Sequence, residues 1–337
     1  MRTYRVEESF GLDNIKTAEV DAPDLLAHEV RLAVRATTLN YRDLLMVTGQ
    51  YNPKQPLPFT PLSDGVGEVI EVGAAVRGVA VGDRVCPLFA PGWLAGEMTR
   101  DTLSQTLGGP VDGMLREQMV VAGHSVVKVP DHLSDEQAAA LPCAAVTAWS
   151  ALVTHGGVKA GDDILLLGTG GVSIFALQFA KALGARVIIT SSSDEKLERA
   201  RSLGADHTVN YAADPAWGKA VRKLTGGRGV DHVVEVGGVG TLGQSLRAVR
   251  SNGCVSLIGV LSGNTSDVSL LPALMNNIRI QGIFVGHRES FEAMNRCISA
   301  HRIEPVVSMS FGADDVASAF RAMESGKHFG KIAVTVS

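Results

Sequence analysis

The second half of the chain alternates continuous apolar runs with amphipathic stretches of helical period. The apolar runs are predicted as strands buried on both faces, at 163–168 (DILLLG), 185–190 (ARVIIT), 206–211 (DHTVNY), 232–238 (HVVEVGG), 254–260 (CVSLIGV) and 278–286 (IRIQGIFVG). Helices are predicted between them, and the first two end at Gly184 and Gly204, where a residue with positive φ is typical. Buried strands joined by helices are typical of a parallel sheet covered on both sides. The pattern therefore predicts a doubly wound α/β domain with six strands, the size of a dinucleotide-binding domain.

The first part of the chain has a different pattern. The segments 29–39 (EVRLAVRATTL) and 64–73 (DGVGEVIEVG) show alternation or β-branched runs, and a turn is expected at Gly82-Asp83. The segment 55–61 (QPLPFTP) contains three prolines and cannot lie inside a central strand. We predict a small, mostly antiparallel barrel or sandwich.

The last fifty residues continue with a helix, a Pro-containing segment at 303–311, a second helix at 316–326 and a last strand at 331–337. This tail is too short to fold alone, so we expect it to pack against the first region. The predicted domains are the first part of a β-rich domain at 1–127, a dinucleotide-binding domain at 128–286 and a return segment at 287–337 that completes the first.

The sequence GTGGVS at 168–173 stands between the first apolar run and the first helix of the predicted sheet. Glycines at such a position allow a tight turn and the close approach of backbone to a pyrophosphate. The N–H groups and the dipole at the helix start attract that negative charge. Ser173 replaces the third glycine that is usual here, and it is small enough to keep most of the clearance. The alternative is a purely structural turn. The candidate cofactor-binding residues of this loop are Gly168, Gly170, Gly171 and Val172.

The end of the second predicted strand indicates which dinucleotide binds. An NAD-binding domain usually has an acidic residue there for the ribose 2′-hydroxyl. This chain has Ser191, Ser192 and Ser193 instead, followed by Lys196, which suits a 2′-phosphate. Ser192 and Glu195 have the spacing of a capping box, which gives Glu195 a structural role. The alternative for Lys196 is a solvated helix position. We therefore predict NADPH rather than NADH.

Composition excludes several classes of function. The net charge of -4 and the lack of a basic block argue against a nucleic-acid partner. No signal sequence opens the chain and no apolar run reaches the roughly 20 residues of a spanning helix, so we expect a cytoplasmic protein without a membrane segment. The four cysteines lie far apart, and no His/Cys cluster of metal-ligand spacing occurs.

Several motifs in order resemble the medium-chain dehydrogenase/reductase superfamily, and specifically its zinc-free quinone-oxidoreductase-like branch. They are ATTLNYRD (36–43), DGVGEVIEVG (64–73), VGDRV (81–85), GPVDGMLREQMVV (109–121), LPCAAVTAWSAL (141–152), GTGGVS (168–173), SLGADHTVNY (202–211) and GKIAV (330–334). The resemblance covers nearly the whole chain. It implies a GroES-like catalytic domain, split between the two ends of the chain, around a Rossmann domain.

The resemblance also implies an active site without zinc. Zinc-using members have a ligand cysteine where this chain has Asn40, and a Gly-His-Glu where it has Leu62-Ser63-Asp64. Cys143 matches a third ligand position, but one soft ligand cannot build a tetrahedral site. Without a Lewis acid, the acceptor must already be electrophilic, such as a quinone or an activated alkene.

The catalytic candidates follow from the same resemblance. Asn40 is expected to face the nicotinamide and to hydrogen-bond a substrate oxygen, and Tyr41 and Tyr51 are candidate proton donors. The alternative for each tyrosine is ordinary packing. Arg42 and Asp43 are interpreted as a structural pair.

Other cofactor contacts are implied by position alone. Thr147 is expected near the nicotinamide, Tyr211 near the 2′-phosphate, and Lys331 near the cofactor. The remaining candidates follow the last three strands and are Gly237, Ile258 to Val260, Phe284, Val285 and Gly286. The alternative for the glycines is turn formation.

These observations lead to an NADPH-dependent, metal-independent reductase of quinones or activated alkenes (enones or enoyl thioesters). Two alternatives stay open, a zinc-free alcohol dehydrogenase or carbonyl reductase, and an NADPH-binding protein without catalysis. The last strand of the sheet is an apolar edge that would invite pairing if it were bare. In the family that edge pairs with its twofold mate, so we expect a homodimer.

Overall fold

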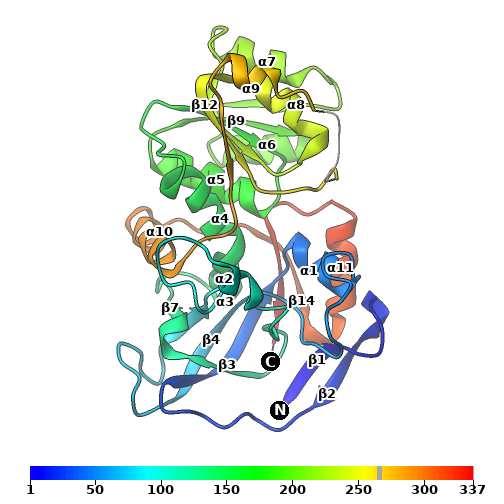
Figure 1. The fold of residues 1–337 in the computed structure, drawn as a ribbon, viewed down its shortest axis with the longest axis vertical. Coiled ribbons are helices and arrows are strands. Elements are labelled where there is room, and N and C mark those ends of the chain that lie inside the picture. The colour runs from blue at the N-terminus through cyan, green and yellow to red at the C-terminus, as the bar shows by residue number, and fades with distance from the viewer. Residues whose placement is uncertain (264–267, 337) are drawn as a thin grey trace. The chain divides into compact units, whose positions relative to one another are not determined.

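The computed structural model describes residues 1–263 and 268–336 of the chain. The contacts between residues divide it into two compact units (Figure 1). The first contains residues 1–144 and 286–337, and the second contains residues 145–285. The fold class expected from the sequence, a β-rich region together with a six-stranded parallel sheet and its helices, is confirmed.

The second unit is built on a parallel sheet whose strands lie in the order β10-β9-β8-β11-β12-β13. This is the third-second-first-fourth-fifth-sixth order of dinucleotide-binding sheets. The strands are β8 Asp163–Leu167, β9 Arg186–Ser191, β10 His207–Asn210, β11 Val230–Glu235, β12 Val249–Leu257 and β13 Arg279–Gly282. Its helices are α4 Val146–Trp149, α5 Gly171–Ala182, α6 Asp194–Ser202, α7 Trp217–Leu224, α8 Val239–Ala248 and α9 Leu271–Met275.

Helices cover this sheet as the pattern of strands buried on both faces predicts. Every residue of β8 and of β11 is buried. Helices α7 and α8 contact each other, while α5 packs on β8 and β9 with α4 against it, on the other side of the sheet (Figure 1). Helices α5 and α6 are followed by Gly184 and Gly204 with φ of 79° and 101°, as expected for glycine after a helix end.

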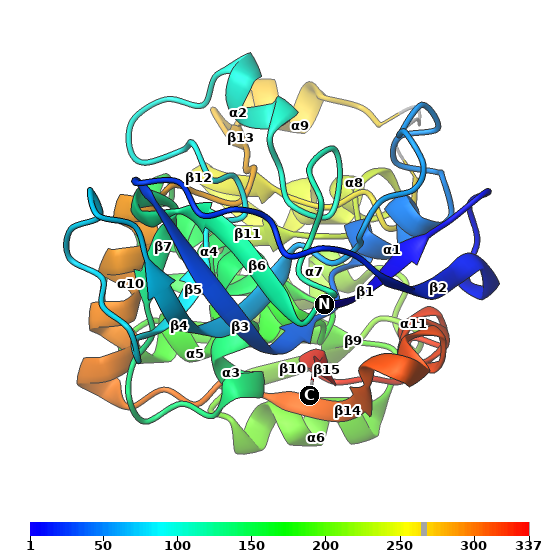
Figure 2. The ribbon, with the colours of Figure 1, turned by 90° about the horizontal axis from the view of Figure 1, so that it is seen from below.

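The first unit is built on a seven-stranded sheet in the order β14-β15-β3-β4-β5-β7, with β6 paired to β3 (Figure 2). A separate hairpin contains β1 and β2. The strands are β1 Arg2–Val6, β2 Ile15–Glu19, β3 Glu29–Thr38, β4 Asp64–Val72, β5 Arg84–Pro87, β6 Gln118–Ala122, β7 Val126–Lys128, β14 Val307–Gly312 and β15 Lys331–Thr335. The helices are α1 Tyr41–Val47, α2 Arg100–Ser104, α3 Asp135–Ala139, α10 Arg288–His301 and α11 Val316–Glu324.

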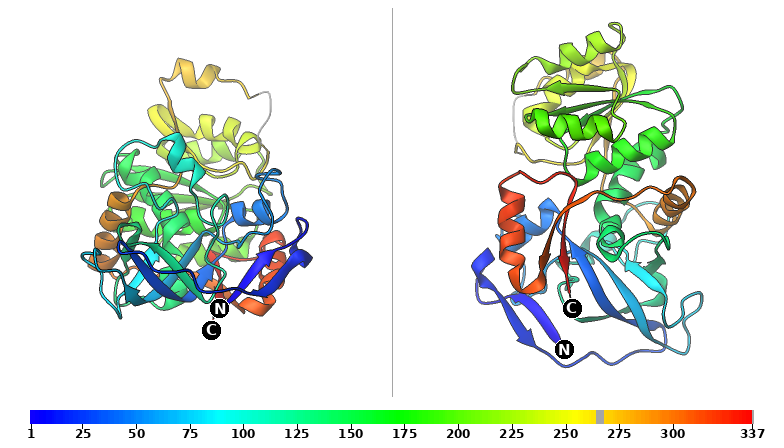
Figure 3. Two further views of the ribbon diagram at one scale, coloured as in Figure 1. Left: turned by 60° about the horizontal axis from the view of Figure 1, so that its bottom comes forward. Right: turned by 180° about the vertical axis from the view of Figure 1, so that it is seen from behind.

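The C-terminal segment completes the sheet of the first unit. Strand β15 pairs antiparallel with β3, so that Ala333 lies opposite Thr38, and β14 pairs parallel with β15. In the right-hand view of Figure 3 these last two strands lie side by side next to α11. Helix α11 buries a stripe at helical spacing, from Val316 through Ala319 and Phe320 to Met323. The segment therefore supplies two neighbouring strands of this sheet and part of the core.

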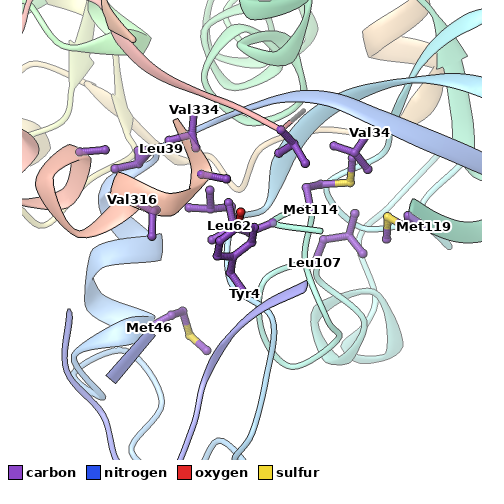
Figure 4. Close-up of a cluster of buried hydrophobic side chains, with 14 of the residues drawn as sticks. Tyr4, Val34, Leu39, Met46, Leu62, Leu107, Met114, Met119, Val316 and Val334 are labelled. Carbon is purple, nitrogen blue, oxygen red and sulfur yellow. The ribbon is translucent and has the colours of Figure 1, made fainter. Parts of the chain in front are cut away.

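The first unit extends further along the chain than the predicted 1–127. Residues up to 144 contact it, because α3 packs on β3, β4 and β15. Its main core gathers side chains from the N-terminal strands, the β3–β4 connection and the C-terminal segment (Figure 4). Leu62 and Val334 are both fully buried in it. Ser63 and Asp64, which follow Leu62 in the sequence, are therefore attached to a packed core.

Candidate active site

The glycine loop of the second unit has the backbone geometry of an anion cradle. Gly168 has a φ of 72°, and α5 begins at Gly171 with Gly170 as its N-cap. A Cβ added to Gly168 or to Gly170 would meet nothing within 4 Å, so space is open beside both residues. The first N–H groups of a helix have no partner within the helix and favour a negative group. The loop therefore fits the pyrophosphate of a dinucleotide.

Two hydroxyl groups hold this loop in place. Ser173 Oγ donates a hydrogen bond of 2.7 Å to the carbonyl oxygen of Leu167, which ties α5 to the end of β8. The N–H of Gly168 donates to Thr190 Oγ1 at 3.3 Å, which ties the loop to the neighbouring strand. Ser173 thus does more than fit the place of a third glycine, since its hydroxyl fastens the helix to the strand.

The serines after β9 take different positions. Ser191 is buried at the end of the strand, and Ser192 is exposed. Ser193 is the N-cap of α6, where its hydroxyl accepts from the N–H of Lys196 at 3.4 Å. The capping box predicted for Ser192 and Glu195 is therefore wrong by one residue, because the helix begins after Ser193.

Positive charge gathers just after these serines. Lys196 is half-buried, and its burial, together with the nearby guanidinium of Arg199, lowers the pKa of its ammonium group. Arg199 lies one turn further along α6, a spacing that could have identified it from the sequence. Tyr211 is exposed just after β10, and its N–H donates to the carbonyl oxygen of Ser191 at 3.1 Å. Two cations and several hydroxyl groups thus surround the end of β9.

A buried carboxylate that sequence reasoning missed shapes the loop after β11. Glu235 Oε1 accepts from the N–H groups of Gly237 and Gly238 at 2.8 and 3.0 Å and from Thr241 Oγ1 at 2.6 Å. Its other oxygen accepts from Ser245 Oγ. Glu235 is therefore a structural group that orders the loop containing the candidate Gly237.

The remaining candidates from the second half of the chain occupy varied surroundings. Thr147 is buried on α4, and Val260 is exposed after β12. Phe284 and Val285 follow β13, and Val285 has a φ of 45°, in the left-handed region. Gly286 belongs to the first unit by its contacts.

In the first unit, three strand ends bring a buried ionic cluster together. Asn40 follows β3, Asp64 begins β4, and Lys331 begins β15. Lys331 is only 3% exposed, and its Nζ donates to Asn40 Oδ1 at 2.6 Å, Asp64 Oδ2 at 3.2 Å and the carbonyl oxygen of Leu39 at 2.8 Å. All three ammonium hydrogens therefore have acceptors within the protein.

A second carboxylate lies beside this cluster. Asp43 is fully buried; its Oδ1 accepts from Arg42 Nη1 at 3.2 Å and from the N–H of Ser63 at 3.2 Å. Its Oδ2 accepts from the N–H of Asn40 at 2.9 Å, which holds the start of α1. Burial raises the pKa of Asp43, and the Arg42 guanidinium opposes that effect. Arg42 and Asp43 form the structural pair that the sequence predicted.

The two predicted tyrosines lie on the exposed side of this region. Tyr41 is the first residue of α1 and is 43% exposed, and Tyr51 is 51% exposed. The guanidinium carbon of Arg42 lies 5.4 Å from the centre of the Tyr51 ring. At this distance the Tyr51 ring makes a cation–π contact with Arg42, so Tyr51 lies beside the Arg42–Asp43 pair.

The chemistry of the donor set does not fit zinc. Asn40, Ser63 and Asp64 supply an amide, a hydroxyl and a carboxylate, whereas zinc favours thiolate and imidazole nitrogen. The ammonium group of Lys331 already bonds both Asn40 and Asp64. Loss of hydration, with the negative charge of Asp64, raises the pKa of the Cys143 thiol and disfavours the thiolate that metals need. Within residues 1–263 and 268–336, no three His, Cys, Asp or Glu side chains gather to hold a metal ion.

The backbone before Ser63 is strained. Leu62 has a φ of 70° although it is not glycine, and its side chain is buried. Such a conformation costs about 1–3 kcal/mol and persists only where the surroundings enforce it. Here the carbonyl oxygen of Leu62 accepts from the N–H of Met114 at 2.8 Å, and the Ser63 N–H is held by Asp43. These two hydrogen bonds hold the strained backbone and thereby fix where Ser63 and Asp64 lie.

Two family profiles match the chain. The alcohol dehydrogenase GroES-like domain matches residues 26–131, and the zinc-binding dehydrogenase domain matches residues 171–300. A zinc-type alcohol dehydrogenase-like protein from Schizosaccharomyces pombe is 43% identical over 98% of this chain and 97% of its own length. Quinone oxidoreductase-like protein 2 from Bos taurus is 29% identical over 94% of this chain and 88% of its own.

Solved structures are similar over the whole chain. An NAD-dependent alcohol dehydrogenase has a TM-score of 0.91 at 33% identity, and the match covers 100% of this chain and 100% of its own. The 2-octenoyl-CoA carboxylase reductase CinF, solved with NADP and 2-octenoyl-CoA, has a TM-score of 0.86 at 26% identity, over 99% of this chain and 87% of its own. No helix in the described part of the chain is long and apolar enough to cross a membrane.

Proposed function

We propose, from the premise that this chain belongs to the medium-chain dehydrogenase/reductase superfamily, that it is an NADPH-dependent reductase of quinones or activated alkenes that uses no metal. Oxidoreductase chemistry follows from the family itself. The choice of acceptor and the absence of a metal rest on one observation, the Lys331 ammonium bonded to Asn40 and Asp64. A protein cation thus holds the residues that replace a zinc site.

NADPH is favoured by the residues at the end of β9. Ser191, Ser192 and Ser193 offer hydroxyl groups, and Lys196 and Arg199 offer positive charge to a 2′-phosphate. The glycine loop before α5 would hold the pyrophosphate. When bound, NADPH supplies the hydride from its nicotinamide ring. CinF, one of the similar structures, was solved with NADP, which supports this choice.

An acceptor that is already electrophilic is favoured because the residues of the polar cluster do not fit a Lewis-acid metal and are bonded to the Lys331 ammonium group. Asn40 offers a neutral amide to a substrate oxygen, and such a donor is too weak to activate a simple alcohol. A quinone or an enone carries its own conjugated carbonyl group, which takes up the negative charge that a hydride brings. The names of the bovine relative and of CinF support this substrate class.

An alcohol dehydrogenase or carbonyl reductase without zinc is the second candidate. It is favoured by the names of the Schizosaccharomyces pombe relative and of the NAD-dependent structure. The two candidates differ in the acceptor, since only the second reduces aldehydes that have no conjugated double bond.

An acceptor panel tests the proposal directly. The purified protein would be mixed with NADPH or NADH and with a benzoquinone, a linear enone or a saturated aldehyde of equal length, and the loss of nicotinamide absorbance followed. We expect turnover with NADPH and the first two acceptors, unchanged after dialysis against a chelator. Loss of activity with the chelator and its return with zinc would contradict the metal-independent reaction. Turnover of the saturated aldehyde alone would favour the second candidate.

A further inference from the structure

We propose that Lys331 is a positioning residue that fixes the side-chain amide of Asn40, so that Asn40 presents an N–H to the carbonyl oxygen of the acceptor. This inference rests on the proposed function and adds a specificity to it. The selected acceptors are those whose reduced carbon is conjugated to a carbonyl oxygen, as in enones, enoyl thioesters and quinones.

The orientation of the amide follows from counting donors and acceptors. An ammonium group only donates hydrogen bonds, so the Asn40 atom at 2.6 Å from Lys331 Nζ must be the amide oxygen. The amide nitrogen then points the other way, and it donates to Ser63 Oγ at 3.2 Å. An amide nitrogen carries two hydrogens, and Ser63 accepts only one of them. In the part of the chain that the structure describes, the second N–H of the half-buried Asn40 has no acceptor, which leaves it for a substrate.

The opposite orientation is disfavoured on energetic grounds. A flipped amide would direct N–H groups at the ammonium group of Lys331, which has no lone pair to accept them. A buried donor without an acceptor loses its hydration with nothing in return, and the cost is greater beside a charge. Lys331 cannot turn away, because its other two hydrogens are held by Leu39 and Asp64.

Asp64 keeps Lys331 in this place. It is fully buried, and its Oδ2 accepts from Lys331 Nζ and from Thr38 Oγ1 at 3.3 Å. Within the described residues its Oδ1 has no hydrogen-bond partner, so the carboxylate depends strongly on the ammonium group. An ion pair of this kind is costly to break from one side only. A variant that removes the positive charge of Lys331 must therefore neutralise Asp64 as well.

The fixed N–H acts where charge develops during the reaction. The hydride pair forms the new C–H bond at the β-carbon, and the electrons of the C=C bond move to the carbonyl oxygen. The hydride would come from bound NADPH, which would leave as NADP⁺, and a proton from solvent would complete the reduced product. A fixed donor at the developing oxyanion is worth about 10²–10³-fold in kcat in other enzymes. An amide free to rotate would present an oxygen to that oxyanion part of the time.

The first experiment removes the positioning group while keeping charge balanced. Lys331→Met with Asp64→Asn removes one positive and one negative charge, and Lys331→Arg keeps a group that only donates. We expect the double variant to lose about ten- to a hundredfold in kcat with the enone while the KM for the enone changes little, and Lys331→Arg to stay within a few fold of wild type. A folded double variant with full enone kcat would overturn the proposal. The matched control is Lys181→Met with Asp206→Asn, which removes the 2.7 Å ion pair between α5 and the segment before β10.

The second experiment needs no turnover and so separates this inference from the proposed function. In Asn40→Asp, an oxygen of the new carboxylate would face the Lys331 ammonium, which lowers its pKa. Carbon-13 NMR of the protein without ligands would measure that pKa with Lys331 present and in the background Lys331→Met with Asp64→Asn. We expect a pKa lower by about one unit or more when Lys331 is present. Equal pKa values of the carboxylate introduced by Asn40→Asp in the two backgrounds would refute the contact between position 40 and Lys331, whatever the acceptor panel shows. A clear difference in that pKa without any turnover would contradict only the proposed reaction. If the double variant does not fold, Lys331→Arg and Asn40→Asp still decide the question. Lys331→Arg must keep enone turnover, and Asn40→Asp must lose it, because a carboxylate has no hydrogen to donate to the carbonyl oxygen.

Discussion

At the scale of single residues, Lys196 and Arg199 are expected to separate NADPH from NADH. Both lie on α6 directly after the three serines, and each has a positive charge that a 2′-phosphate can use. Burial lowers the pKa of Lys196, and the positive charge of Arg199 lowers it further. A phosphate would relieve that repulsion by pairing with both groups.

We therefore predict that Lys196→Ala and Arg199→Ala each raise the KM for NADPH and leave the KM for NADH nearly unchanged. The loss of one charged contact is worth about 1.5–3 kcal/mol, or roughly ten- to a hundredfold in KM. Steady-state kinetics with both cofactors measure the effect, and Lys223→Ala on the exposed part of α7 is the control. An unchanged NADPH KM in both variants would place the 2′-phosphate elsewhere.

Residue-level chemistry could be predicted only where it depends on neighbours in sequence. The glycines of the loop before α5 and the Arg42–Asp43 pair follow from local pattern, and the family resemblance pointed to Asn40. The hydrogen-bonded ion pair between Lys331 and Asp64 joins residues 267 positions apart, so no local sequence pattern predicts it. Glu235 was missed for a different reason. An acidic residue inside an apolar run does not indicate which N–H groups will donate hydrogen bonds to its carboxylate.

At the scale of elements, strands such as β8 and β11 of the second unit were predictable because every residue in them is buried. The last strand, β13, is mostly exposed and was recognisable only by its apolar run. The short helix α9 was not predictable: it has five residues, none of them buried, and no apolar period marks it. The start of α6 was misplaced by one residue because Ser192 and Ser193 have equal capping propensity, and the strand before them decides between the two. The length of the first unit was underestimated because α3 joins it through tertiary contacts.

The start of β11 contains an ion-pair group with a consequence for stability at low pH. Burial alone would raise the pKa of Asp231, but hydrogen bonds from Arg228, the N–H of Asp163 and Arg250 outweigh it and hold the pKa well below the usual range. A carboxylate with a lowered pKa in the folded state binds fewer protons there than in the unfolded state. Its contribution to stability is therefore full above about pH 4 and is lost as the pH falls further.

We predict that Asp231→Asn lowers the free energy of unfolding at neutral pH by about 2 kcal/mol, because charge-assisted hydrogen bonds are lost. The difference from wild type should shrink as the pH falls below about 4, because the unfolded state then binds a proton at this carboxylate while the folded state, with its lowered pKa, does not. Urea unfolding at several pH values measures it. A difference that stays constant over that range would show that the pKa of Asp231 is not lowered.

At the scale of the whole molecule, the family assignment and the fold class from the sequence are confirmed. The assembly stays a prediction, and we propose a homodimer formed through β13 and α9. Strand β13 is the last in the order of its sheet, and Ile280 on it is exposed. Leu271, Leu274 and Met275 on α9 are between 60% and 74% exposed, which is unusual for large apolar side chains so close together.

The prediction is that the wild-type protein elutes at twice the chain mass in size-exclusion chromatography at micromolar concentration. Leu274→Glu together with Met275→Lys should convert it to a monomer, because charges would be buried at the contact. Leu26→Glu, at an exposed leucine of the first unit, is the matched control and should stay dimeric. A wild-type protein that is monomeric at that concentration would contradict the proposal.

The ammonium group among Asn40, Asp64 and Leu39 also constrains how this lineage can change. A histidine or cysteine introduced at position 40 or 63 would have to compete for space with a resident positive charge that is almost fully buried, since Lys331 is 3% exposed. Replacing Lys331 first would leave the buried Asp64 carboxylate without its cation. Each single substitution toward a metal site is therefore disfavoured by itself. Descendants of this sequence are therefore expected to diversify their acceptors by altering surrounding walls, while the ionic centre is inherited unchanged or replaced in several positions together.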